Sequence, residues 1–87
     1  MNPDLHNFKE FRQGYWYNVE VTSAGADGSL HQAEVTIYAV GTDGARTILL
    51  EGFLVPETFS TDGLARRSGE AFAEKYIDDR LASFGTP

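Results

Sequence analysis

Positions 15–22 read YWYNVEVT, and aromatic or β-branched residues alternate there with mostly polar ones. An alternation with a period of two is typical of a β-strand that turns one face toward the core. The first face carries Tyr15, Tyr17, Val19 and Val21, and the second carries Trp16, Asn18, Glu20 and Thr22. We therefore expect a strand here, with its first face buried.

Two further strands are predicted downstream, and turn-forming residues separate the three runs. Asp27 and Gly28 mark the tip of the first turn, and a glycine-bounded tetrapeptide at 41–44 forms the second. Residues 46–55 are apolar on both faces, and the proline that follows ends the run. These features predict a three-stranded antiparallel meander over residues 15–55. The face expected to meet a helix comprises Tyr17, Val19, Val21, Val35, Ile37, Ile48, Leu50 and Leu54.

Residues 60–84 carry the signals of a C-terminal helix. Ser60 is suited to cap its first turn, and Asp62 lies where a negative charge favours the helix dipole. Apolar residues return every three or four positions, which predicts one face against the sheet. Gly69 lies in the middle of that face, where the missing side chain would let the helix approach the strands closely. The face comprises Ala65, Gly69, Phe72, Ala73, Tyr76, Ile77, Leu81 and Phe84.

Residues 1–14 predict a short N-terminal helix. An asparagine and a proline suit its start, Leu5, Phe8 and Phe11 share one face, and a glycine ends it. Taken in order, the segments predict an α+β fold of two layers, α-β-β-β-α, in which the amphipathic C-terminal helix packs on the three-stranded antiparallel meander. A chain of 87 residues suffices for a single domain, which would span residues 1–87.

The composition limits the class of protein. Seven Lys and Arg residues oppose 13 Asp and Glu residues, so the net charge is −6 with both histidines neutral. This sign disfavours general binding to nucleic acid or to an anionic membrane. The absence of cysteine excludes disulfides and fits a reducing compartment. No signal peptide and no membrane-spanning run is recognisable, so we expect a soluble cytoplasmic protein.

The predicted order of elements resembles that of the double-stranded-RNA-binding domain, and its β-β-β-α part is similar to the arm-type DNA-binding modules of some integrases. The first resemblance implies a basic cluster at the start of the last helix. The matching positions carry Arg66 and Arg67 as an anion-binding pair, but Glu70 follows instead of a lysine-rich run. The second implies DNA contact through the sheet, where this sequence places glutamates. Nucleic acid is therefore an alternative partner, with Arg12, Arg46, Arg66 and Arg67 as its contacts.

No pattern of catalytic or metal-binding residues stands out. His6 and His31 lack the spacing of a metal site, and no serine lies in a nucleophile elbow. Glu70, Glu74 and Asp78 repeat every four residues, which is typical of a solvated helix face. We therefore predict no enzymatic activity, no metal and no cofactor. Another alternative is an acidic inhibitor or decoy protein that acts through this row.

The second face of the predicted sheet carries the candidate site. An antiparallel meander brings Trp16, Tyr38 and Leu49 together. Phe53 and Val55 follow along the third strand. Either the N-terminal helix covers this aromatic face, or the face stays open to another protein chain. The third strand, apolar and at the edge of the sheet, offers a second route to self-association. Our main hypothesis is a small acidic, non-enzymatic protein-binding module whose partner at this face is either another protein or a second copy of the chain, as a homodimer.

Overall fold

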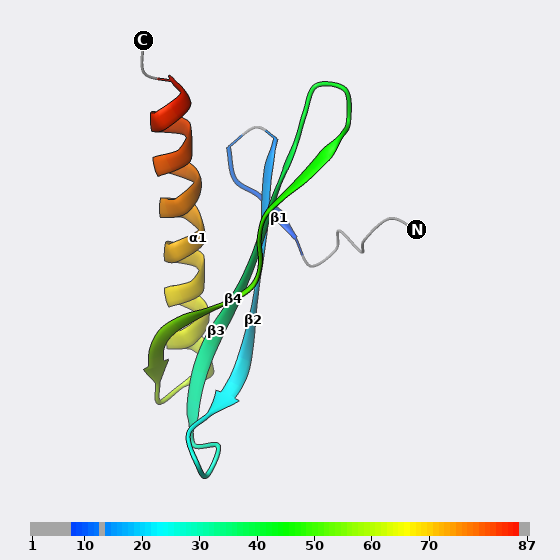
Figure 1. Ribbon diagram of the computed structural model, residues 1–87. Helices are drawn as coiled ribbons and strands as arrows, with labels where there is room; N and C mark the ends of the chain where they lie inside the picture. Colours follow the sequence, from blue (N-terminus) through cyan, green and yellow to red (C-terminus); the bar gives the residue numbers. More distant parts are fainter. Residues whose placement is uncertain (1–7, 13, 86–87) are drawn as a thin grey trace.

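The computed structural model describes residues 8–12 and 14–85. Within them the chain forms four antiparallel strands followed by one helix. These are β1 (Lys9–Glu10), β2 (Tyr15–Ala24), β3 (Leu30–Val40), β4 (Arg46–Phe59) and α1 (Asp62–Gly85). The strands lie in the order β1-β2-β3-β4. α1 lies along one face of the sheet, the helix face, and leaves the outer face uncovered by any helix in this part of the chain (Figure 1). The predicted α+β class is confirmed.

The predicted N-terminal helix is wrong for the described part of that segment. β1 instead adds a fourth strand beside β2. Phe8 contacts the ring of Tyr38 on the outer face, and Phe11 contacts the ring of Tyr17 on the helix face. The extended backbone sends the two phenylalanines to opposite faces, and packing on both faces outweighs the helix propensity of so short a segment. Leu5 and the rest of residues 1–7 lie outside the described residues.

Both predicted turns are present. The backbone N–H groups of Gly28 and Gly44 each donate a hydrogen bond to the carbonyl of the glycine three residues earlier. Both glycines have a positive φ, 71° and 82°, which a side chain would disfavour. In the first turn the Asp27 carboxylate accepts hydrogen bonds from the Ser29 hydroxyl and N–H. These bonds lower the pKa of Asp27 and hold the turn closed.

The core lies between α1 and the helix face. Its buried residues are Tyr17, Val19, Ala33, Val35, Ile37, Val55, Ala73 and Ile77. The buried positions of α1 recur every fourth residue, as the sequence predicts, and they are Ala65, Gly69, Ala73 and Ile77. The side chain of Phe84 lies outside the described part of the structure.

The start of α1 differs slightly from the prediction. The Thr61 hydroxyl accepts a hydrogen bond from the Leu64 N–H at 3.2 Å, so Thr61 caps the helix rather than Ser60. Asp62 then lies in the first turn, as expected. The cap moves by one residue because either hydroxyl satisfies the local pattern, and the path of the chain from β4 decides between them.

The alternation of faces along β4 is interrupted by β-bulges. Phe53 pairs with Val35 of β3. Leu50, three residues earlier, pairs with Ile37, which is only two residues further along β3. Gly52 lies at this extra position with a φ of 61°, and its N–H donates to the hydroxyl of the facing threonine at 3.1 Å. A second shift in register lies between the pairs Ile37–Leu50 and Tyr38–Ile48, closer to the start of β4. Each bulge reverses which residues point to the helix.

These bulges correct the predicted faces of β4. Ile48 and Leu54 pair with outer-face residues of β3, so the prediction that they lie under the helix is wrong. Phe53 and Val55, predicted on the opposite face, belong to the helix face. The Phe53 ring stacks on Phe72 of α1 with centroids 5.0 Å apart, and Val55 belongs to the core cluster.

Candidate protein-binding surface

One row of side chains crosses the outer face through all four strands. Glu10, Trp16, Tyr38 and Ile48 are successive Cα partners from β1 to β4. The rings of Trp16 and Tyr38 stack with centroids 6.4 Å apart and planes 8° from parallel. Tyr38 is only 2% exposed, whereas Ile48 is 55% exposed. The row is therefore buried at Tyr38, in its centre, and exposed to solvent at Ile48, its β4 end.

Side chains on three sides account for the burial of Tyr38. Trp16 stacks beside it, Phe8 lies with its ring centroid 5.1 Å away, and the Arg46 guanidinium lies 5.7 Å from the ring centroid. Burial raises the pKa of the Tyr38 phenol, and the charge of Arg46 partly opposes this. A partner cannot reach Tyr38 unless these side chains move.

The five residues of the predicted site do not share one face. Trp16 and Tyr38 are neighbours on the outer face. Leu49, at a bulge, packs against the core, and Phe53 and Val55 lie on the helix side. Strand alternation alone groups the five residues, because it takes no account of the extra residues in β4. An isolated glycine within a strand pattern is the signal that could have indicated them.

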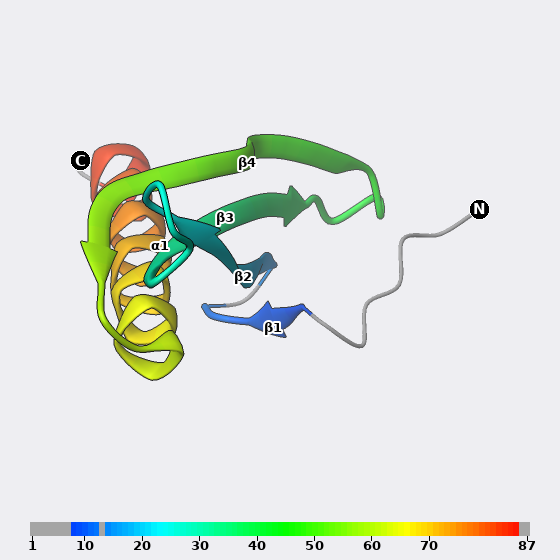
Figure 2. The ribbon, with the colours of Figure 1, turned by 90° about the horizontal axis from the view of Figure 1, so that it is seen from below.

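The two most exposed apolar side chains of the outer face lie on β4. Ile48 is 55% exposed and Leu54 is 46% exposed. β4 hydrogen-bonds to β3 alone in the sheet, and Figure 2 shows it at the margin opposite β1. The predicted apolar edge strand is therefore present, and its exposed outer-face residues are ones that the sequence pattern assigned to the core.

The outer face also carries opposite charges at separate places. Arg46 lies beside the Ile48 end of β4. Glu20 and Glu34 are Cα partners on β2 and β3, and Glu34 faces Leu54. Like charges directly opposite in a sheet repel. The face thus has a cation near Ile48 and an acidic pair near Leu54.

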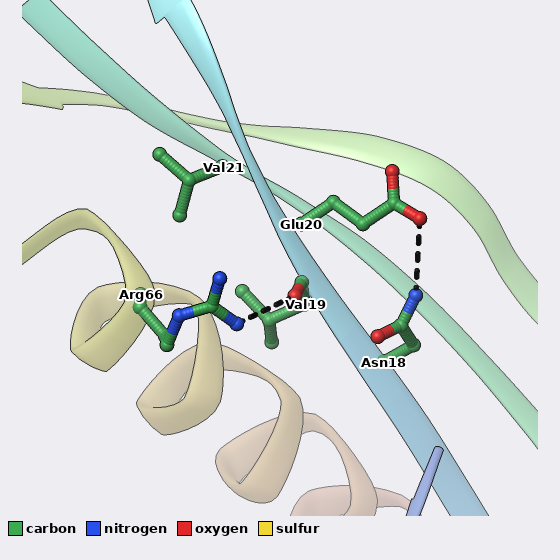
Figure 3. A pocket seen from close by; sticks show the side chains of 5 residues that line it. All are labelled: Asn18, Val19, Glu20, Val21 and Arg66. Atoms are coloured by element: carbon green, nitrogen blue, oxygen red, sulfur yellow. Dashed lines mark hydrogen bonds between the residues drawn. The ribbon is translucent and has the colours of Figure 1, made fainter. Parts of the chain in front are cut away.

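The predicted anion-binding pair, Arg66 and Arg67, does not form a joint site. Arg66 reaches from α1 to β2, where its Nη1 donates to the Val19 carbonyl at 3.0 Å (Figure 3). A polar hollow of about 430 Å³ lies at this contact, lined by Asn18, Val19, Glu20, Val21 and Arg66. β1 pairs with only two residues of β2. Beyond that pairing, at the edge of β2, Arg66 supplies the hydrogen-bond donor to the Val19 carbonyl. Arg67 is exposed.

The acidic row of α1 takes part in the fold. The Tyr17 hydroxyl donates to Glu74 at 2.8 Å. Arg12 Nε donates to Asp78 at 2.9 Å, and this hydrogen bond and charge raise the pKa of the Arg12 guanidinium. Two of the three carboxylates of the predicted decoy row are therefore bound within the molecule. Arg12 reaches α1 while Arg46 lies on the outer face, so the arginines of the nucleic-acid hypothesis do not converge.

The remaining candidate residues form no cluster. His31 lies in β3 opposite Ser23, and His6 lies outside the described residues. In residues 8–12 and 14–85, no three His, Asp or Glu side chains gather as metal ligands would. Over the same ranges, no helix has the length and apolar character that crossing a bilayer requires.

Comparisons with protein-family models, with curated proteins and with solved structures found no match to this chain.

Proposed function

We propose that this chain is a non-enzymatic protein-binding module that forms a homodimer through the β4 half of its outer face. The dimer surface comprises Arg46, Ile48, Leu54 and Glu34. The observation that supports it is the exposure of Ile48 and Leu54, two large apolar side chains on one face of an edge strand. Their burial against a second copy contributes about 25 cal/mol for each Å² of apolar surface removed from water.

The charges of this surface are self-complementary. A two-fold axis brings one part of a patch against a different part of the same patch on the twin. Arg46 lies at the Ile48 end and Glu34 faces Leu54, so an axis between the two ends brings Arg46 of each copy toward Glu34 of the other. This pairing offsets part of the repulsion between two chains that each carry a net charge of −6.

The contact is made by side chains rather than by a continuous eight-stranded sheet. The bulge at Gly52 bends the strand, and Pro56 has no N–H to donate. Both features are typical of edge strands that resist backbone pairing. The exposed side chains of the outer face remain available, and they therefore carry the proposed association.

Size-exclusion chromatography with light scattering tests the dimer. We expect the wild-type protein to be dimeric at high micromolar concentration and the Ile48→Lys/Leu54→Lys variant to be monomeric. Leu30→Lys is the control, because Leu30 is also exposed, at 37%, and lies at the β2–β3 hairpin. A monomeric wild-type protein, or a dimer that survives the double substitution, contradicts the proposal.

A charge exchange tests the two-fold arrangement. Arg46→Glu and Glu34→Arg should each weaken the dimer about tenfold, since each leaves like charges facing across the axis. The combined variant rebuilds the pair in the opposite sense and should recover most of the loss. Additive losses in the combined variant contradict the pairing of Arg46 with Glu34.

A further inference from the structure

A cleft of about 580 Å³ lies beside Trp16, between the β1–β2 turn and the β3–β4 turn. It is lined by Glu10, Gly14, Trp16, Val40, Gly41 and Thr42. The lining combines an aromatic ring, a carboxylate, a hydroxyl and glycine backbone. The volume lies within the range of small-ligand sites, about 300–1,000 Å³. None of its lining residues belongs to the proposed dimer surface.

The Glu10 carboxylate is held in place at this cleft. Its Oε2 accepts a hydrogen bond from the Gly14 N–H at 3.1 Å, and Oε1 accepts none from residues 8–12 and 14–85. The two cationic neighbours in the sequence point elsewhere. Lys9 lies on the helix face, and Arg12 binds Asp78 of α1. The negative charge of Glu10 is therefore not neutralised by Lys9 or Arg12.

A second carboxylate, that of Asp43 in the β3–β4 turn, lies next to the lining residue Gly41 but is not itself part of the lining. Asp43 Oδ1 accepts a hydrogen bond from the Ala45 N–H at 3.0 Å. The same oxygen lies 3.0 Å from the position that a Cβ on Gly41 would take, and Gly41 lines the cleft. The Glu10 carboxylate of β1 thus lines the cleft together with the indole of Trp16, and a second carboxylate lies in the β3–β4 turn that borders the cleft.

We propose that this cleft binds an arginine side chain from a basic segment of a partner protein. A guanidinium can lie flat on the face of an indole and donate from its edge to a carboxylate at the same time. Trp16 and Glu10, which are Cα partners, offer these two contacts side by side. The net charge of −6 attracts a basic segment from a distance. This binding is independent of the proposed homodimer.

Trp16 is the protein's one tryptophan, so its fluorescence reports on the cleft directly. The probe is a blocked peptide of alternating glycine and arginine, titrated at low salt. We expect a saturable change in Trp16 emission, and binding about tenfold weaker for the same peptide with citrulline, which has the shape of arginine without its charge. Equal binding of the two peptides, or no saturable change, overturns the proposal.

Matched variants locate the charge that is recognised. Glu10→Gln should weaken the arginine peptide about tenfold and leave the thermal unfolding unchanged, since the new amide oxygen can still accept from Gly14. Glu57→Gln removes one exposed charge from β4, outside the cleft, and should bind as the wild type does. An equal loss in both variants means attraction by net charge alone and overturns the site.

Two further experiments test whether another cation binds the cleft more tightly and whether peptide binding depends on the dimer. A lysine peptide or spermidine that binds more tightly than the arginine peptide overturns the assignment to a guanidinium. The Ile48→Lys/Leu54→Lys variant should keep most of the peptide binding even as a monomer, since its two added charges weaken only the long-range attraction. Failure of the dimer test therefore leaves the cleft proposal standing, whereas loss of peptide binding in this variant contradicts its independence.

Discussion

Gly69 shows how one missing side chain sets the distance between α1 and the sheet. A Cβ at this position would lie 2.5 Å from Val19 Cγ1 and 2.8 Å from Ala33 Cβ. Gly69→Ala should therefore lower the free energy of unfolding by up to about 2 kcal/mol, because overpacking costs about 1–3 kcal/mol and the helix propensity of alanine offsets about 1 kcal/mol of it. Urea denaturation measures this change.

Gly63 provides the matched control for that substitution. It also lies in α1, and a Cβ there would meet no heavy atom within 4 Å. Gly63→Ala should leave the free energy of unfolding unchanged or raise it by up to about 1 kcal/mol. A Gly69→Ala variant that is more stable than the wild type would show that the helix can retreat from the sheet without loss.

Tyr17 makes the stability of the fold depend on pH. Burial, then the hydrogen bond to Glu74 and the charges of Glu74 and Glu70, raise the pKa of the Tyr17 phenol above its usual value of 10.0. The folded protein holds this proton more tightly than the unfolded chain. The resulting stability is complete below pH 10 and is lost as the pH rises above that value.

The pH prediction is tested with Tyr17→Phe. Between about pH 8 and about pH 11, the free energy of unfolding should fall less steeply in this variant than in the wild type, since a titrating group is gone. A residual decline remains, because burial also raises the pKa of Tyr38. Urea denaturation at several pH values measures the slopes, and identical slopes would exclude Tyr17 as a source of the dependence.

At the scale of the strand, Gly52 decides which side chains of β4 face solvent. Its φ of 61° is a conformation that alanine adopts at a cost of about 1–2 kcal/mol and that asparagine tolerates better. Gly52→Ala should therefore lower the melting temperature by roughly 4–8 °C for each kcal/mol lost, and Gly52→Asn should lower it less. Calorimetry provides the comparison. Equal melting temperatures for the wild type and Gly52→Ala would mean that the bulge needs no glycine.

The whole molecule should open from its margins. β3 is paired along both sides, whereas β1 contributes two residues at one margin of the sheet. Hydrogen exchange monitored by NMR should therefore show the amides of Val35 and Ile37 protected at least about 100-fold more than those of β1. Similar protection in β1 and β3 would indicate that the sheet opens as one cooperative unit, and would contradict this order.

The sequence predicts the parts of the fold that depend on local pattern. Strand alternation in β2 and β3, the two turns and the apolar face of α1 are all present, because each arises from contacts among residues close in the chain. The small residue at Gly69 follows from helical periodicity, and the pairing of Trp16 with Tyr38 follows from strand alternation combined with the position of the turn between β2 and β3.

The faces of β4, the strand β1 and the helix cap at Thr61 are decided by the tertiary structure. In each case, several local conformations fit the sequence equally well, and only packing against distant residues selects one. Phe8 and Phe11 take an extended path because partners exist on both sides of the sheet. Ile48 and Leu54 are exposed because bulges in β4 change its register against β3. Register is a property of two strands together, so no single run of residues can specify it.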